Sequence, residues 1–369
     1  MDGDAFTHGL RIALLAGGDS AEREISLASG SQTALALALA GHEPVLMDPA
    51  EINLAAIDWP AFDVCFVALH GGAGEDGRIQ HELEQWGVPY TGSGPATSGL
   101  AMSKSAAKAR FAQCGVPTPP SVVFSAAEFR RYSVPGSATS NGTGFSSRLG
   151  QQLAALGFPL VIKPEGQGSS LGISVAAGVS DLPRSVAVAA TFDDLIMAEP
   201  FVTGREITIS LLGRDPLPMI EIVAPQRLFT YDAKYSNPKT EYRLDARLPA
   251  AVEAELYRTA ISAAEALGTA GLVRVDIILD HHHQPWVLEV NTIPGMTARS
   301  LAPRAARGAG IEMPALVDWM VRDARQRWKH GHDEKRTTPA EPVASSSSGS
   351  ILGAGRNCRK TSRKWRTKQ

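Results

Sequence analysis

Two acidic residues face each other across a predicted β-hairpin near the C-terminal end of the chain. The hairpin joins the apolar strands 272–280 and 285–291 through the polar turn 281–284. Antiparallel pairing sets Asp276 directly opposite Glu289, where two Cβ atoms lie about 5 Å apart and like charges destabilise a sheet. A bound cation would offset this repulsion, so the pair predicts chemistry that depends on a divalent metal ion.

The residues beside this pair support the same interpretation. With Asp280 facing Pro285, Arg274 lies opposite Asn291, and side-chain alternation places both on the face of the two carboxylates. Two carboxylates and an amide oxygen suit Mg²⁺, which prefers oxygen ligands and often shares them with nucleotide phosphates. The alternative is a solvated hairpin in which the acids only pair with Arg274. The many Val, Ile and Leu residues of both strands argue against a fully wet surface.

A candidate phosphate site begins where the predicted strand 158–164 leads from Lys163 into EGQGSSLG (165–172). Glycines let backbone amides approach phosphates closely, and Ser169 and Ser170 add hydroxyl donors. Neither the P-loop pattern nor the dinucleotide fingerprint occurs where a strand meets a helix. The Gly/Ser segment alone is equally typical of an ordinary turn, but the lysine before it favours nucleotide binding.

The strand 194–202 ends at a candidate site for a nucleotide base. Glu199, Phe201 and Val202 lie at its carboxyl end, where backbone groups and apolar side chains suit a flat adenine ring. Together with the Gly/Ser segment, this strand end favours a site for an adenine nucleotide.

The elements that position these residues alternate between strands and helices in the first hundred residues. Strands are predicted at 11–16, 62–69 and 88–92, and helices at 21–39 and 78–86. This order is typical of a parallel sheet with helices on its faces, and ligands then gather outside the carboxyl ends of the strands. The fold class is therefore mixed α/β. Further helices are predicted at 98–114 and 250–267, further strands at 204–213 and 218–223, a surface insertion at 133–147 and a polar loop at 225–249.

Composition and charge limit the class of protein. The chain of 369 residues is long enough for two or three domains, and no apolar stretch of about 18 residues predicts a membrane span. Its start lacks the pattern of a secretory signal, and Cys65, Cys114 and Cys358 show no metal-ligand spacing. A reduced, cytoplasmic compartment is expected.

The C-terminal segment 329–369 differs from the rest in charge. It carries ten basic and three acidic residues, a net charge of +7, which leaves −9 for residues 1–328. With few apolar residues to bury, we expect a disordered basic tail. Such a tail offers a small possibility of nucleic-acid binding, but an extension without an essential role is the better interpretation.

Seven segments resemble the D-alanine–D-alanine ligases, members of the ATP-grasp superfamily. The resemblance runs from about Arg11 to Trp328, and several independent segments in the right order make it specific. The segments are GGDSAEREISL (17–27), LHGGAGEDGRIQ (69–80), PYTGSG (89–94), KPEGQGSSLG (163–172), YDAKY (231–235), RVD (274–276) and LEVNTIPGMTARSL (288–301). The resemblance implies a three-domain ATP-grasp architecture: a Rossmann-like α/β domain at 1–100, a central ATP-grasp subdomain at 101–199, and a catalytic domain at 200–328.

The resemblance also assigns roles to individual residues. ATP binding falls to Lys104, Lys163, Ser170, Glu199, Phe201, Val202, Glu206 and Lys234. Two Mg²⁺ or Mn²⁺ ions are expected on Asp276, Glu289 and Asn291. The two D-alanine molecules are expected to contact Glu22, His70, Lys234, Ser300 and Leu301. The catalytic set is Glu22, Ser169, Tyr235, Arg274 and Gly295, with Arg274 and the Gly295 amide at the oxyanion and the other three closing a loop over the site.

The expected reaction follows from the same resemblance. Such enzymes use ATP to activate one D-alanine as an acyl phosphate, which the amine of a second D-alanine attacks to give a peptidoglycan precursor. The segment 225–249 is the expected lid, and Tyr235 favours the dipeptide because relatives making D-alanyl-D-lactate usually carry phenylalanine there. A homodimer without a membrane anchor is implied.

Simpler roles exist for four of these residues. Glu22 follows Asp19 at a capping-box spacing and would then only cap its helix, while Lys104, Ser300 and His70 suit a solvated lysine, a loop serine and a satisfied strand-end histidine. The sequence is also compatible with two rival functions. One is a related ligase for D-lactate or another D-amino acid, and the other is a nucleotide-binding regulator without catalysis.

Overall fold

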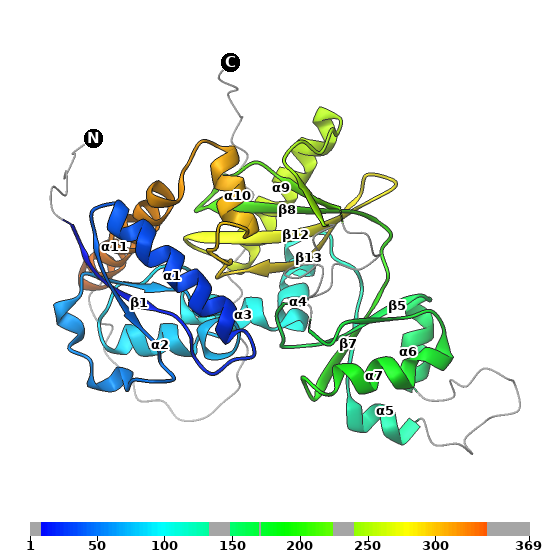
Figure 1. Cartoon of the computed structure of the whole chain (residues 1–369). Coiled ribbons are helices and arrows are strands. Elements are labelled where there is room, and N and C mark those ends of the chain that lie inside the picture. Colours follow the sequence, from blue (N-terminus) through cyan, green and yellow to red (C-terminus); the bar gives the residue numbers. More distant parts are fainter. Residues whose placement is uncertain (1–8, 133–147, 170, 224–239, 338–369) are drawn as a thin grey trace, which may run out of the picture.

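Three β-sheets organise the chain in the computed structural model (Figure 1), which describes residues 9–132, 148–169, 171–223 and 240–337. Several predicted features lie outside the described residues: the insertion 133–147, most of the lid 225–249, the tail beyond Thr337, and the site residues Ser170, Lys234 and Tyr235. None of the helices in the described ranges combines the length and apolar character that crossing a bilayer requires.

The N-terminal sheet is parallel, as the alternation of strands and helices predicts. Its order is β2-β1-β3, with β1 at Arg11–Leu15, β2 at Glu43–Met47 and β3 at Val64–Val67. The strand β2 was not predicted. It is a short edge strand that contains Pro44, and proline within a strand is tolerated mainly at sheet edges. The predicted strand at 88–92 contributes a single bridge, from Tyr90 to Cys65.

Helices from both ends of the chain cover this sheet (Figure 1). The helix α1 (Arg23–Leu39) and the C-terminal helix α11 (Met313–Thr337) share one hydrophobic cluster with β1 and β3. His42 Nε2 lies 3.0 Å from Asp318 Oδ1 and links the two regions. Because α11 continues through Thr337, the helix extends past Lys329, where we expected the tail to begin.

The predicted helix at 98–114 is two helices. The structure has α2 at Arg78–Gln85, α3 at Pro95–Met102 and α4 at Lys104–Cys114, with an extended residue, Ser103, between the last two. Ser103 ends one helix and caps the next, since its hydroxyl accepts a hydrogen bond from the Ala106 amide at 3.3 Å. This break makes Lys104 the first residue of α4.

The central sheet is antiparallel, in the order β4-β7-β5-β6, and the helices that follow its strands pack against it. Its cluster of buried Leu, Ile and Ala side chains is separate from the other cores. The elements are β4 (Val122–Ser125), α5 (Ala126–Tyr132), α6 (Arg148–Leu156), β5 (Leu160–Pro164), β6 (Ser174–Ala176), α7 (Leu182–Ala189) and β7 (Leu195–Pro200).

The third sheet has the order β11-β10-β8-β12-β13, with β9 paired to β8. One face packs on α4 and α9, which share a cluster with β8 and β12. The elements are β8 (Gly204–Leu212), β9 (Asp215–Pro216), β10 (Ile220–Val223), β11 (Glu241–Arg243), α9 (Ala250–Leu267), β12 (Leu272–Asp280), β13 (Pro285–Asn291) and α10 (Leu301–Gly308).

Phe111 lies at the centre of the cluster between α4 and this sheet and is fully buried. Replacing Phe111 with alanine is expected to lower the free energy of unfolding by about 3–5 kcal/mol, because the cavity left behind cannot fully collapse. Urea denaturation followed by tryptophan fluorescence measures this change. The exposed Leu39 serves as the control, since Leu39→Ala should cost little. Equal losses for the two variants would contradict the assignment of this core.

The β12–β13 hairpin has the predicted pairing at the acidic residues but not at the turn. Asp276 lies opposite Glu289 and Arg274 opposite Asn291, as predicted. Nearer the turn Leu279, not Asp280, faces Pro285, because the register shifts between Asp276 and Ile277. A β-bulge inserts one extra residue into one strand. Because of this extra residue, Asp276 lies opposite Glu289 as predicted, although the pairing nearer the turn is shifted by one residue.

Candidate active site

A cavity of about 310 Å³ opens where the three sheets meet. Its lining comes from the start of α1, the segment after β3, the junction of α3 and α4, the Gly-rich segment after β5, the ends of β12 and β13, and the segment before α10. Ten of the predicted site residues line it: Glu22, His70, Lys104, Ser169, Arg274, Glu289, Asn291, Gly295, Ser300 and Leu301. Segments far apart in the sequence therefore converge on one site.

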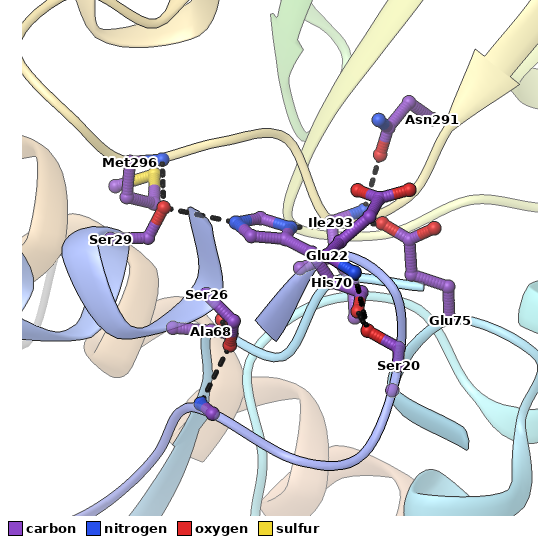
Figure 2. Close-up of polar contacts among 12 residues, drawn as sticks. Ser20, Glu22, Ser26, Ser29, Ala68, His70, Glu75, Asn291, Ile293 and Met296 are labelled. Atoms are coloured by element: carbon purple, nitrogen blue, oxygen red, sulfur yellow. Dashed lines mark hydrogen bonds and ion pairs between the residues drawn. The ribbon is translucent and has the colours of Figure 1, made fainter. Parts of the chain in front are cut away.

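His70 belongs to a hydrogen-bonded chain at one end of the cavity (Figure 2). Its Nε2 lies 3.0 Å from Ser29 Oγ, and the Met296 amide donates to the same hydroxyl at 3.3 Å. Its Nδ1 lies 3.7 Å from Glu75 Oε1. Ser29 and Glu75 were not predicted as site residues, yet they orient the ring between α1 and the segment that precedes α10.

Glu22 does not cap its helix. It occupies the N-cap position of α1, yet its carboxylate makes no capping hydrogen bond, while the Ser20 hydroxyl accepts from the Glu22 amide at 3.1 Å. A Cβ at Gly168 would lie 3.1 Å from Glu22 Oε1. The Glu22 side chain therefore points at the Gly-rich segment from the opposite wall of the cavity, and the simpler role as a helix cap is wrong.

Arg274 and Asp276 form a buried ion pair with two hydrogen bonds. Arg274 Nε and Nη2 donate to the two carboxylate oxygens at 2.8 and 2.7 Å, and both side chains are about nine-tenths buried. Thr208 on β8 donates to Asp276 Oδ1 at 2.7 Å. Thr208 was not predicted, because nothing in the sequence shows that β8 lies beside β12.

The donors on this face fit a divalent cation of the magnesium type. Asp276, Glu289 and Asn291 supply only oxygen ligands, and they lie at paired positions on two adjacent strands. Asn291 Oδ1 already accepts the Ile293 amide at 2.9 Å, which orients its side chain (Figure 2). Asp276 pairs with Arg274, as the alternative interpretation expected, and this ion pair offsets part of the repulsion from Glu289. Because the ion pair is buried, the hairpin is not solvated at this point.

Lys104 joins the start of α4 to the Gly-rich segment. Its Nζ donates to the backbone oxygens of Gln167 at 2.5 Å and Glu165 at 3.3 Å. Burial lowers the pKa of Lys104, an effect that Glu289 partly opposes. Lys104 is buried at the cavity wall, so the simpler role as a solvated helix lysine is wrong.

Glu165 fixes the base of the Gly-rich segment. Its Oε1 accepts from the Ser103 hydroxyl at 2.7 Å, the Ser105 amide at 2.8 Å and the Ser105 hydroxyl at 2.6 Å. Burial acts to raise the pKa of Glu165, but these hydrogen bonds outweigh it and hold the pKa below its ordinary value. Gly166 donates its amide to Asp193 Oδ2 at 2.7 Å, which secures the next residue.

The start of α10 provides an anion-binding geometry. Ser300 is the N-cap of α10 without a side-chain capping bond, and its hydroxyl lies 2.9 Å from Thr297 Oγ1. The first amides of a helix have no partner within it and favour a carboxylate. Gly295 approaches closely, since a Cβ there would lie 2.8 Å from Ser300 Oγ. This combination suits the carboxylate of an amino acid.

The predicted residues for the nucleotide base lie outside the cavity lining. Glu199, at the end of β7, and Lys163, at the end of β5, form a buried ion pair of 2.5 Å. Phe201 and Val202 follow β7 as half-buried residues, and Glu206 lies on β8. A further lysine, Lys108, lies 2.5 Å from Glu199. Lys108 was missed, although it is four residues from Lys104 and so shares its helix face.

Comparisons with known proteins agree with this geometry. Two family profiles match: one described as D-ala D-ala ligase N-terminus over residues 49–93, and one described as D-ala D-ala ligase C-terminus over residues 113–322. A D-alanine–D-alanine ligase of Bordetella petrii is 43% identical over 319 residues, which cover 85% of this chain and 92% of that protein.

The chain belongs to the D-alanine–D-alanine ligase family. A family member from Albidiferax ferrireducens is 39% identical over 338 residues, covering 90% of this chain and 92% of the other. The crystal structure of a D-alanine–D-alanine ligase from Bacillus anthracis aligns with a TM-score of 0.74 at 30% identity, over 88% of this chain and all of that one. The predicted fold class is thereby confirmed, because the ligase family shares this ATP-grasp architecture.

A second alignment concerns a ligase with a different product. The structure of VanG D-Ala:D-Ser ligase from Enterococcus faecalis aligns with a TM-score of 0.71 at 25% identity, over 86% of this chain and all of that one. The D-alanine–D-alanine ligase from Bacillus anthracis has also been solved in complex with ATP, with a TM-score of 0.71 and 27% identity to this chain. The ligase fold therefore accommodates more than one second substrate.

Proposed function

We propose that this chain joins two D-alanine molecules to D-alanyl-D-alanine at the expense of ATP, through an acyl-phosphate intermediate. The observation that carries the proposal is that Arg274, Glu289, Lys104 and the start of α10 line one and the same cavity, in a chain of the D-alanine–D-alanine ligase family. Cations for phosphates, oxygen ligands for a metal ion and a carboxylate site are all required for this reaction.

The ATP phosphates are assigned to the lysines and the Gly-rich segment. Lys104 and Lys163, with Lys234, neutralise the charge of the transferred phosphoryl group, and Ser170 adds a hydroxyl donor. Glu199, Phe201 and Val202 hold the adenine and Glu206 the ribose. The oxygen of the first carboxylate attacks the γ-phosphorus, the bond to the β-phosphate oxygen breaks, and ADP leaves.

Two Mg²⁺ or Mn²⁺ ions are proposed on Asp276, Glu289 and Asn291, whose oxygen donors fit these metals. When bound, such ions neutralise phosphate charge and hold the phosphates in line for transfer. The chain's own contribution is the opposed pair Asp276 and Glu289 and the orientation of Asp276 by Thr208.

The second half of the reaction uses the other wall of the cavity. Glu22 binds the ammonium of the first D-alanine with His70 nearby, while Ser300 and the Leu301 amide bind the carboxylate of the second, with Lys234. The neutral amine of the second molecule attacks the acyl carbon. Arg274 and the Gly295 amide stabilise the oxyanion. The bond from the acyl carbon to the phosphate oxygen then breaks, and phosphate leaves with the proton that the amine loses, which gives the peptide.

Exclusion of water is a further requirement, because water hydrolyses an acyl phosphate. We assign this role to the segment 225–249 and to a hydrogen-bonded trio of Glu22, Ser169 and Tyr235. The approach of Glu22 Oε1 toward Gly168 supports the first contact of this trio. We also propose that the enzyme is a homodimer acting in the cytoplasm, with domains at 1–100, 101–199 and 200–328.

A coupled ADP-release assay across D-amino acids, with products identified by mass, tests the function. ADP release that depends on D-alanine, with D-alanyl-D-alanine as product, is the expected result. In a competition at neutral pH with D-alanine and D-lactate, or D-serine, we expect mainly the D-alanyl-D-alanine dipeptide. Mainly depsipeptide or D-alanyl-D-serine would assign the chain to a related ligase, and ATP binding without turnover would indicate a regulator.

A further inference from the structure

A buried carboxylate between two lysines lies beside the proposed adenine site. Glu199 is 3% exposed, with Oε1 2.5 Å from Lys108 Nζ and Oε2 2.5 Å from Lys163 Nζ. The three residues come from α4, β5 and β7, so the cluster joins the central sheet to the helix that carries Lys104. Each oxygen of Glu199 therefore faces one ammonium group and keeps a lone pair that can accept a hydrogen bond from a nucleotide base.

The two lysines differ in how firmly they are held. Lys108 Nζ also donates to Thr118 Oγ1 at 2.7 Å and to the Pro119 oxygen at 2.9 Å, so two hydrogen bonds hold it besides its ion pair with Glu199. Thr118 in turn donates to the Val287 oxygen at 2.8 Å, on the same strand as Glu289. Within the described residues, Lys163 has Glu199 as its one acceptor.

The charges of the cluster are unbalanced. One carboxylate faces two ammonium groups in a buried space, and a buried charge without a partner is costly. Burial acts to raise the pKa of Glu199, but Lys163 and Lys108 outweigh it and hold that pKa below its ordinary value. Burial lowers the pKa of Lys108 to about 8, which still leaves it charged at neutral pH. The surplus positive charge suits an incoming triphosphate.

We propose that Lys108 is the fixed counter-ion that keeps Glu199 ionised as the acceptor for the adenine amino group, whereas Lys163 leaves Glu199 for the triphosphate. This rests on the proposed ATP-dependent function and adds a residue that determines which base is accepted. Lys108 is a positioning residue, because it acts through Glu199.

The consequence is selectivity for a 6-amino over a 6-carbonyl purine. An ionised Glu199 accepts from the amino group of adenine and repels the carbonyl oxygen of hypoxanthine. Without Lys108, burial raises the pKa of Glu199, and a protonated carboxyl can donate to that carbonyl. The preference between the two bases should then shrink, a change that loss of packing alone does not predict.

The test compares the affinities of ADP and IDP, which differ in the base, by calorimetry in the presence of Mg²⁺. The unmodified enzyme should prefer ADP, and Lys108→Met should reduce this preference by about 10- to 100-fold, as expected for a hydrogen bond to a charged group. Lys108→Arg keeps the charge and should retain most of the preference. Lys329→Met, at an exposed lysine of α11, is the matched control and should retain all of it.

A second variant covers the case in which Lys108→Met does not fold. The double variant Lys108→Met/Glu199→Gln removes the buried charges of Lys108 and Glu199 and should also lose the preference, because an amide can donate as well as accept. An unchanged preference in the double variant, or in a folded Lys108→Met, overturns the proposal, as does an unmodified enzyme that binds ADP and IDP equally. If the role of Lys108 is overturned but the enzyme still releases ADP in a D-alanine-dependent way, the proposed function stands. If that activity is absent, the proposed function itself is wrong.

Discussion

Replacing Arg274 with alanine is expected to lower kcat by about a hundredfold or more. A preorganised cation at the oxyanion of an acyl-transfer reaction contributes about 3–4 kcal/mol to transition-state stabilisation. Arg274 lines the cavity, and its guanidinium is held rigidly by two hydrogen bonds to Asp276. The coupled ADP-release assay with saturating ATP and D-alanine measures the change.

Two controls separate the oxyanion role from the support of Asp276. Arg274→Lys keeps the charge but loses the geometry of two parallel hydrogen bonds. Its turnover should therefore lie between that of the unmodified enzyme and that of Arg274→Ala. Arg214→Ala, at an arginine whose side chain is 81% exposed, should leave turnover unchanged. If purified Arg274→Ala turns over at a near-normal rate, the oxyanion role is wrong. If it loses turnover only in proportion to weaker Mn²⁺ binding, Arg274 serves Asp276 instead.

Replacing Glu289 with glutamine is expected to weaken Mn²⁺ binding in the presence of ADP by about a hundredfold or more. Loss of the residues that merely support metal ligands already costs about 10- to 100-fold in affinity, so removing the charge of a ligand should cost at least as much. Glu289 lines the cavity directly opposite Asp276. Electron paramagnetic resonance of free Mn²⁺ during a titration gives the affinity.

The substitution should also lower kcat, because the phosphates then lose part of their charge neutralisation. Glu82→Gln, at an exposed residue of α2, is the matched control and should bind Mn²⁺ normally. Normal Mn²⁺ affinity in Glu289→Gln would show that the opposed carboxylates of the hairpin do not hold a metal ion, and the proposed mechanism would need other ligands.

Local patterns predicted the elements of this chain well where periodicity is strong. The helix at 250–267 has the same bounds in the structure, and the strands β1 and β12 lie within one residue of their predicted ends. The strand β5 ends where predicted but begins two residues later. The errors occurred where one residue changes the backbone. Ser103 divides the predicted helix 98–114, and the β-bulge shifts the register near the turn.

The part of the candidate site that was predicted also depends on local patterns along the chain. Arg274, Glu289 and Asn291 lie on one hairpin, so alternation along two adjacent strands suffices to group them. Thr208, Ser29 and Lys108 were missed, because each acts through a residue distant in the sequence: Asp276, His70 and Glu199, respectively.

The amino-acid sequence by itself determined the strongly periodic strands and helices and the pairing of Asp276 with Glu289, because these depend on neighbours along the chain or across a short turn. The tertiary structure alone decided which partners those side chains have. The hydrogen bond from Thr208 to Asp276 and the two lysines on Glu199 exist because segments distant in the sequence pack together. Burial raises the free-energy cost of losing such contacts, since a charge removed from water is stable only beside its partner.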